Sequence, residues 1–235
     1  MNGGTKFLLV LAVLIATAYG WYKANYPSYS WRQKMTVTVS TPHGEVSGSS
    51  VVAVEWRGNF FSGGWGGAKF HESIQGEATV VDLGDGKLLF ALLSYPGAYE
   101  YTGLVSLNQF KGANDAVWSP QAFAKVLAAK DAGPAALSPT LYPMFVRFRD
   151  ISDPKTVERV DPNNLAASFG IGTALVRATI EIIDNPITTG IEKKLVWLPG
   201  GFREKNLTNE GIGMPVRDVP PSHLLTYGAF WSFSK

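Results

Sequence analysis

An uninterrupted apolar run near the N-terminus constrains this chain more than any other feature. Residues 7–22 read FLLVLAVLIATAYGWY and carry no charge, and Lys6 and Lys23 flank them. The run has 16 residues, close to the lower limit of about 17 for a helix that crosses a bilayer. Its length also suits the apolar core of a secretory signal peptide. Both alternatives send the rest of the chain across a membrane.

Residues 1–22 are therefore either an uncleaved signal anchor or a cleaved signal peptide. Residues 16–18 form an A-x-A pattern, so a signal peptidase could cut after them. The residues that follow favour the anchor, because Trp and Tyr gather at membrane–water interfaces. We expect Trp21, Tyr22 and Tyr26 to lie at that interface.

The apolar run predicts a single-pass membrane protein whose body lies across the membrane; in a Gram-negative bacterium this is an inner-membrane protein with its body in the periplasm. After cleavage of the signal peptide, the body would instead be secreted to the periplasm. The flanking charges do not decide the orientation, since Lys6 leads the run while Lys23, Arg32 and Lys34 trail it. A cytoplasmic body is the less favoured alternative.

The composition excludes several classes of site. The chain of 235 residues has no cysteine, so it forms no disulfide, cysteine-ligated zinc site, iron–sulfur cluster or thiol nucleophile. A formal net charge of +2 gives no electrostatic reason to expect nucleic acid. The hydrophobic content of 46% is enough for a packed core.

The alternation of apolar and polar residues predicts a β-rich α+β fold: a mainly antiparallel sheet with a few short helices, preceded by one N-terminal hydrophobic helix. Residues 34–40 and 45–56 should pair as a hairpin, because residues 41–44 supply turn chemistry. The other predicted strands are residues 73–83, 87–93, 142–148, 173–184 and 192–198.

The clearest signal for the start of a helix is at Ser119 and Pro120, a capping residue followed by proline at the first helical position. Phe123, Val126 and Leu127 would share one face of that helix. Asp153-Pro154 and Asp161-Pro162 each predict the start of a further short helix. The domain organisation is then residues 1–22 as signal anchor or signal peptide, 23–33 as an aromatic spacer, and 34–235 as a single β-rich globular domain.

The sequence holds no local catalytic, metal-binding or phosphate-binding motif: H-E-x-x-H, G-x-S-x-G and the P-loop pattern are all absent. Asp150, Asp153 and Asp161 are explained by helix capping. We therefore expect neither metal nor cofactor. His71 and Glu77 are weak candidates for catalytic residues, as polar-face residues that flank an aromatic loop.

That loop is the most unusual local feature after the apolar run. Residues 58–67, GNFFSGGWGG, combine five glycines with Phe60, Phe61 and Trp65. Exposed aromatic side chains of this kind suit contact with a protein, a membrane surface or a sugar. We interpret these three aromatics as binding residues. The alternative is that the loop folds back and its aromatics fill the core.

Four segments carry a resemblance to known proteins: residues 29–56, 76–89, 150–170 and 188–198. With these segments the chain resembles a family of uncharacterised, short exported or membrane-anchored proteins of Gram-negative bacteria. The resemblance implies export and brings no known activity. We therefore expect a membrane-tethered or exported binding or assembly module without catalytic activity, held at the membrane by its N-terminal helix, with an envelope protein as partner. The alternatives are a periplasmic hydrolase with a site assembled from distant residues and a structural envelope protein.

Overall fold

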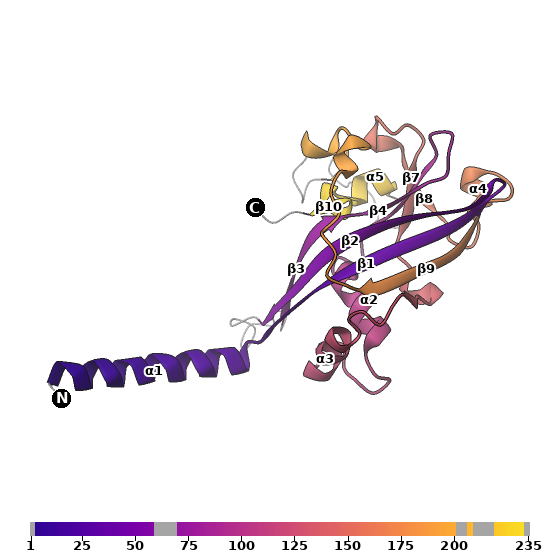
Figure 1. Cartoon of the computed structure of the whole chain (residues 1–235). Helices are drawn as coiled ribbons and strands as arrows, with labels where there is room; N and C mark the ends of the chain where they lie inside the picture. The colour runs from indigo at the N-terminus through magenta and orange to yellow at the C-terminus, as the bar shows by residue number, and fades with distance from the viewer. Residues whose placement is uncertain (1–2, 59–69, 201–205, 209–218, 233–235) are drawn as a thin grey trace.

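The computed structural model describes residues 3–58, 70–200, 206–208 and 219–232. A long helix, α1 (Gly3–Asn25), projects from a β-rich body that contains two antiparallel sheets (Figure 1). The six-stranded sheet has the order β10 (Trp231–Ser232), β3 (Phe70–Glu77), β2 (Gly44–Gly58), β1 (Ser28–Thr41), β9 (Ala174–Ile182) and β6 (Ala135–Ala136). The four-stranded sheet has the order β4 (Thr79–Asp82), β5 (Leu88–Ala91), β7 (Phe145–Phe148) and β8 (Val157–Val160). The predicted fold class is confirmed.

Helices and single turns cover the sheets. The α-helices of the body are α2 (Tyr101–Phe110), α3 (Pro120–Ala128), α4 (Ala166–Phe169) and α5 (Pro221–Leu224). The 3-10 turns are η2 (Pro139–Leu141), η3 (Pro154–Thr156), η4 (Ile191–Lys193), η5 (Leu198–Gly200) and η7 (Tyr227–Ala229). The cap of α3 is as predicted, since Ser119 Oγ accepts the backbone N–H of Ala122.

The core lies in two layers on either side of the four-stranded sheet. The inner face of the six-stranded sheet packs on α2 and α3 near α1, and on β4, β5 and β7 farther along the strands. The opposite face of the four-stranded sheet is covered by the C-terminal segment, through Leu225, Ala229 and Phe230. β5 is thus buried on both faces, as its continuous apolar sequence predicts.

The β1–β2 hairpin is longer than the sequence pattern indicates. Ser28 pairs with Arg57 at one end and Thr41 with Gly44 at the other. The prediction that residues 23–33 form a spacer is therefore corrected. This range holds the last residues of α1 and the first residues of β1. The polar side chain of Gln33 is buried in this stretch, and a polar residue at an inward position hides the alternation that marks a strand.

The predicted strand 73–83 is two strands in two different sheets. Gly76 has a φ of +146°, and the chain passes there from β3 into β4. Glu77, Ala78 and Thr79 are buried in succession, so alternation stops across the junction. Alternation within residues 73–83 predicts Val80 on the buried face with Ile74 and Ala78, whereas Val81 is the buried valine of β4.

Other expectations also need correction. Alternation within residues 173–184 predicts Val176 on the inward face, but Val176 is 40% exposed because a β-bulge displaces it: Val39 pairs with Leu175 and Thr38 with Arg177. Leu127 is 42% exposed at the end of α3. Residues 192–198 form turns and not a strand.

The two Asp-Pro pairs differ. Asp153 caps η3 by accepting the N–H of Lys155. Asp161 instead accepts the N–H of Asn163 in a turn, and α4 begins only at Ala166. Helix α2 carries none of the capping signals of α3: the side chain of its N-cap residue, Glu100, makes no capping hydrogen bond. The sequence pattern therefore did not predict it.

The two sheets approach each other closely at Gly48. A Cβ atom on this residue would lie 1.9 Å from the carbonyl oxygen of Val80 in β4. Because the obstacle is backbone, a side chain at this position would push the sheets apart. A glycine inside a strand often marks a bulge or close packing, and at Gly48 it is close packing.

We predict that Gly48→Ala lowers the free energy of unfolding by about 2 kcal/mol or more. The melting temperature should fall by about 4 to 8 °C, measured by circular dichroism on the solubilised chain. Ser49→Ala at the adjacent exposed position is the control, and its effect should stay within about 0.5 kcal/mol. Equal melting temperatures for Gly48→Ala and the control would contradict the close approach.

Candidate functional site

A hollow of about 540 Å³ lies on the outer face of the six-stranded sheet. Its polar and small lining side chains come from three adjacent strands and from the second residue after β9: Ser30, Arg32, Ala53, Glu55, Ser73, Gln75 and Asp184. They face outward because their neighbours Trp31, Val54 and Ile74 point into the core. We call this hollow the sheet groove.

Residues 183–190, the strap, leave β9 and cross the sheet beside the groove (Figure 1). The backbone N–H of Ile183 donates to the carbonyl oxygen of Arg32 at 3.0 Å. The Arg32 guanidinium donates to the carbonyl oxygens of Asp184 and Asn185 at 3.0 and 3.2 Å. Arg32 thus ties the start of the strap to β1 and forms one wall of the groove.

The far end of the strap is fixed along β2. Thr188 donates its backbone N–H to the carbonyl oxygen of Val51 at 3.0 Å, and Thr188 Oγ1 accepts the Val51 N–H at 2.8 Å. The paired residues of β3 reach only as far as Ala53. The strap therefore takes the place of a neighbouring strand where β3 has turned into β4.

The charges in the groove are already paired. Glu55 accepts two hydrogen bonds of 2.8 Å from Arg57, and this contact lowers the pKa of the Glu55 carboxyl. Asp184 forms an ion pair with Lys130. Exposed ion pairs of this kind contribute at most about 1 kcal/mol, so a partner could replace them at little cost. The groove offers hydrogen-bond donors and acceptors with nearly balanced charge.

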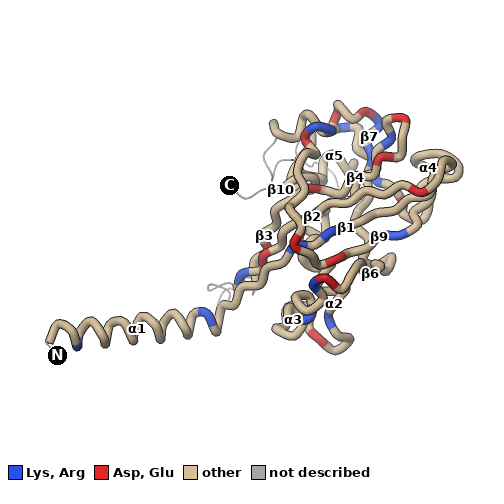
Figure 2. Tube along the Cα trace, in the orientation of Figure 1, with Lys and Arg blue, Asp and Glu red and all other residues tan. Residues whose placement is uncertain are grey.

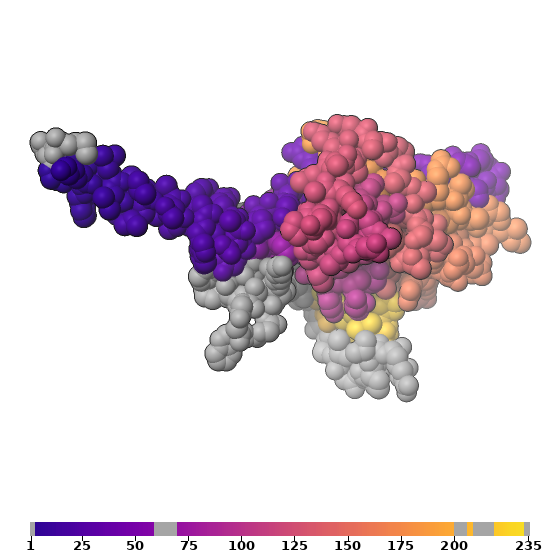
Figure 3. Space-filling view, turned by 90° about the horizontal axis from the view of Figure 1, so that it is seen from below, coloured from indigo at the N-terminus to yellow at the C-terminus, as the bar shows by residue number. Residues whose placement is uncertain are grey.

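Helix α1 meets the body beside the end of the sheet that carries this groove. The structure describes one helix, α1, that is long and apolar enough to cross a membrane or serve as a signal sequence, with a mean hydropathy of 1.6. None of its residues is buried. Figure 2 shows it uncharged between Lys6 and Lys23, and Figure 3 shows it standing clear of the body.

The connection between α1 and β1 is short and packed. The N–H of Gly58 donates to the carbonyl oxygen of Pro27 at 2.9 Å, and a Cβ on Gly58 would lie 2.9 Å from Tyr26 Cα. The Tyr26 ring contacts the rings of Trp21 and Tyr22, with centroids 6.2 and 5.3 Å apart. The three residues predicted for the membrane interface therefore form one cluster where α1 ends.

The aromatic loop residues Phe60, Phe61 and Trp65 lie outside the described residues. The strand ends on either side of that segment, Gly58 and Phe70, are paired with each other next to the end of α1. The assignment of these aromatics as binding residues stays a prediction.

His71 and Glu77, the two weak catalytic candidates, do not come together. They occupy opposite ends of β3, His71 exposed and Glu77 only 6% exposed, about 20 Å apart along the strand. Glu77 Oε2 accepts the backbone N–H of Ile191 at 2.9 Å. Glu77 is therefore a buried tie that holds the segment after the strap, and its expected place on a polar strand face is wrong.

The environment of Glu77 disfavours its charge. Burial raises the pKa of the Glu77 carboxyl, the hydrogen bond from the Ile191 N–H offsets part of this rise, and the nearby Glu192 carboxylate adds to it. This is the expected behaviour of a carboxyl removed from water without a cation beside it.

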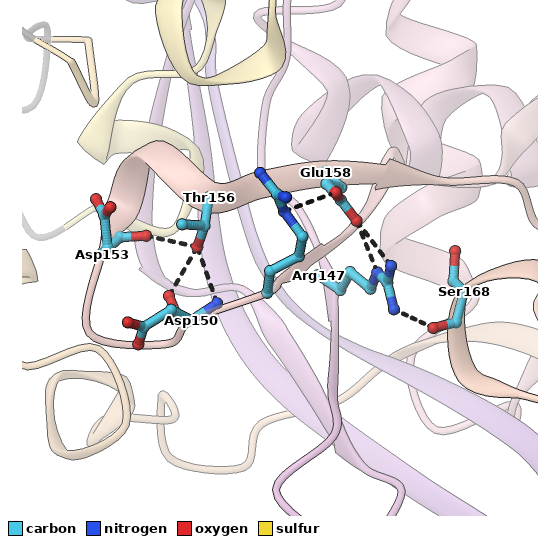
Figure 4. Close-up of polar contacts among 7 residues, drawn as sticks. Arg147, Asp150, Asp153, Thr156, Glu158 and Ser168 are labelled. Atoms are coloured by element: carbon cyan, nitrogen blue, oxygen red, sulfur yellow. Dashed lines mark hydrogen bonds and ion pairs between the residues drawn. The ribbon is translucent and has the colours of Figure 1, made fainter.

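The acidic residues near β7 and β8 serve local structure. Asp150 Oδ1 accepts the backbone N–H of Ser152 at 2.9 Å, and Thr156 Oγ1 donates to the carbonyl oxygens of Asp150 and Asp153 (Figure 4). Arg147 donates twice to Glu158 and once to the carbonyl oxygen of Ser168. The capping interpretation is confirmed for Asp153, which caps η3. It is wrong for Asp150 and Asp161, whose carboxylates accept backbone N–H groups two residues on, at Ser152 and Asn163, in turns. Across the described ranges, no group of three or more His, Asp or Glu side chains could hold a metal ion.

Sequence reasoning did not find the sheet groove. Period-2 alternation places residues such as Glu55 and Gln75 on an outward face, but it does not say which strands are neighbours. Asp184 reaches the groove only because β9 lies next to β1. The register between strands is the missing information.

Comparisons with protein-family models, with curated proteins and with solved structures find no match to this chain.

We predict that Glu77→Gln removes a pH-dependent loss of stability. The folded-state pKa is raised, so the native state binds more protons than the unfolded state as pH rises above the ordinary value of 4.5. Wild-type stability should therefore fall relative to Glu77→Gln between about pH 4.5 and neutrality. Urea unfolding at several pH values measures the difference. Glu181→Gln on the outer face of β9 is the control, and a flat difference for Glu77→Gln would contradict the assignment.

Proposed function

We propose that the protein is a single-pass, membrane-anchored binding or assembly module without catalytic activity, whose body stands in the periplasm. The exposed anchor helix is the observation that supports this most. In α1 the large apolar side chains are exposed to 42% or more: Phe7, Leu8, Leu9, Val10, Leu11, Val13, Leu14 and Ile15. Leaving such side chains in water costs about 1.5–3 kcal/mol each, so a bilayer is their natural environment.

The junction favours an uncleaved anchor over a cleaved signal peptide. Cleavage after Ala18 would leave residues 19–25 as a short helical stub. Trp21 and Tyr22 on that stub are 58% and 45% exposed. Amphipathic rings at the end of a spanning helix suit the lipid head-group region. With the helix retained, the same rings mark where the chain leaves the bilayer.

The packed junction also sets how the body meets the membrane. Only Tyr26 and Pro27 separate α1 from β1, and both pack against Gly58 at the end of β2. A module tethered in this way presents the start of β1, and with it Ser30 and Arg32 of the sheet groove, close to the membrane surface.

The groove favours a polypeptide partner. Its lining combines hydroxyl and amide groups with one cation and two anions that are paired within the chain. Such a surface matches the donors and acceptors of another protein's polar surface. An envelope protein in the same membrane fits this chemistry, in line with the resemblance to exported and membrane-anchored proteins of Gram-negative bacteria.

The anchor is tested by an intact mass of the protein from the membrane fraction. We expect the full-length mass, and extraction by detergent but not by high salt or alkaline wash. A mass that lacks residues 1–18 together with release into the soluble fraction would contradict the anchor and support secretion.

The groove is tested by photocrosslinking in native membranes. A benzoylphenylalanine residue replaces Ser73 or Gln75 in the groove, and in the control it replaces the exposed Ala124 on α3. We expect one discrete higher-mass adduct from each groove position and none of that mass from Ala124. Adducts of equal yield at all three positions would argue against the groove as the binding surface.

A further inference from the structure

A second hollow, of about 340 Å³, lies on the other side of the body, between α5, β8 and the segment around Pro96. Its lining is apolar except for one residue: Pro96, Met144, Val219, Pro221, Leu224, Leu225 and Arg159. The helix α5 packs against β8 and η3. We call this hollow the α5 groove.

The apolar wall of the α5 groove is continuous with the core. Leu225 is 1% exposed and belongs to the cluster that also holds Val146 and Phe90. Met144 is half-buried and packs on the same cluster. The groove therefore opens into a packed apolar layer, which suits the chain of an apolar ligand.

Arg159 supplies the single charge at this site. It is exposed, and it pairs across the strands with Val146, on the opposite face from Arg147 and Glu158. Arg147 and Arg149 both bind Glu158, whereas Arg159 makes no ion pair with any residue in the described part of the chain. Its guanidinium thus has free donors beside an apolar wall.

We propose that the α5 groove binds a fatty acid, with the acyl chain against Met144 and Leu225 and the carboxylate on Arg159. A guanidinium and a carboxylate match in geometry and form charge-assisted hydrogen bonds. The single positive charge of Arg159 balances the single negative charge of a carboxylate. A phosphate monoester carries a charge of about −1.5 to −2, so the carboxylate is the better match. The volume is at the small end of the range for small-molecule sites, so the groove admits one acyl chain and not a two-chain lipid.

The test uses the full-length protein in lipid nanodiscs and a dodecanoate that carries a diazirine at the end of its chain. After irradiation, the labelled peptides are mapped by mass spectrometry. We expect adducts on the peptides that contain Met144 and Leu224, in addition to adducts on α1 from probe dissolved in the bilayer. The α1 adducts serve as an internal measure of probe concentration.

Arg159→Gln should lower the groove adducts about tenfold, the effect of losing one charge-assisted contact, with the α1 adducts unchanged. Arg149→Gln is the matched control and should keep the groove labelling. Leu224→Glu should abolish it, because it places a like charge beside the carboxylate. Circular dichroism confirms that each variant is folded.

Competition tests the head group. Unlabelled dodecanoate should displace the groove label at about tenfold lower concentration than the uncharged dodecanol. Equal labelling of Arg159→Gln and wild type, equal competition by dodecanol, or no groove adduct on the wild-type protein would each overturn the proposal. This inference does not rest on the proposed anchored function, because labelling of the groove is read separately from that of α1.

Discussion

The inward face of the β1–β2 hairpin is the surface on which the rest of the body is assembled. Near α1 it packs on α2 and α3 through Trp31, Val54 and Trp56, and farther out it packs on the four-stranded sheet through Val37 and Val39. No other pair of strands in the described part of the chain is this long. Both core layers, and the position of helix α1, therefore depend on the register of one hairpin.

A buried polar network fixes α2 on this hairpin. Gln33 of β1 accepts from Trp31 Nε1 at 2.9 Å and from the Ser106 hydroxyl, and it donates to the carbonyl oxygen of Thr102 at 2.7 Å. Thr102 in turn donates to the carbonyl oxygen of Leu93 at 2.6 Å. A buried polar group without a partner costs about 1–3 kcal/mol, so α2 has one favourable position and the network specifies it.

The outer face of the same hairpin carries the sheet groove, so one pair of strands serves both stability and the proposed binding. In the described part of the chain, the strap crosses this outer face beside the groove. Arg32 holds the start of the strap, Thr188 pairs with Val51 near its far end, and the buried Glu77 binds the backbone just beyond it. Glu77 thus has a structural role in holding the segment after the strap. Its likeness to a catalytic residue is limited to its titratable carboxyl group.

The sequence by itself determined the apolar N-terminal helix, the β-rich class, the hairpin, the α3 cap at Ser119 and the turn role of Asp153. Each of these depends on residues close together along the chain, where periodicity and capping act. Tertiary structure alone decided the change of sheet at Gly76, the bulge at Val176, the burial of Glu77 and the two grooves. These depend on which strands are neighbours and in what register, and long-range packing sets both, so no local pattern of residues contains them.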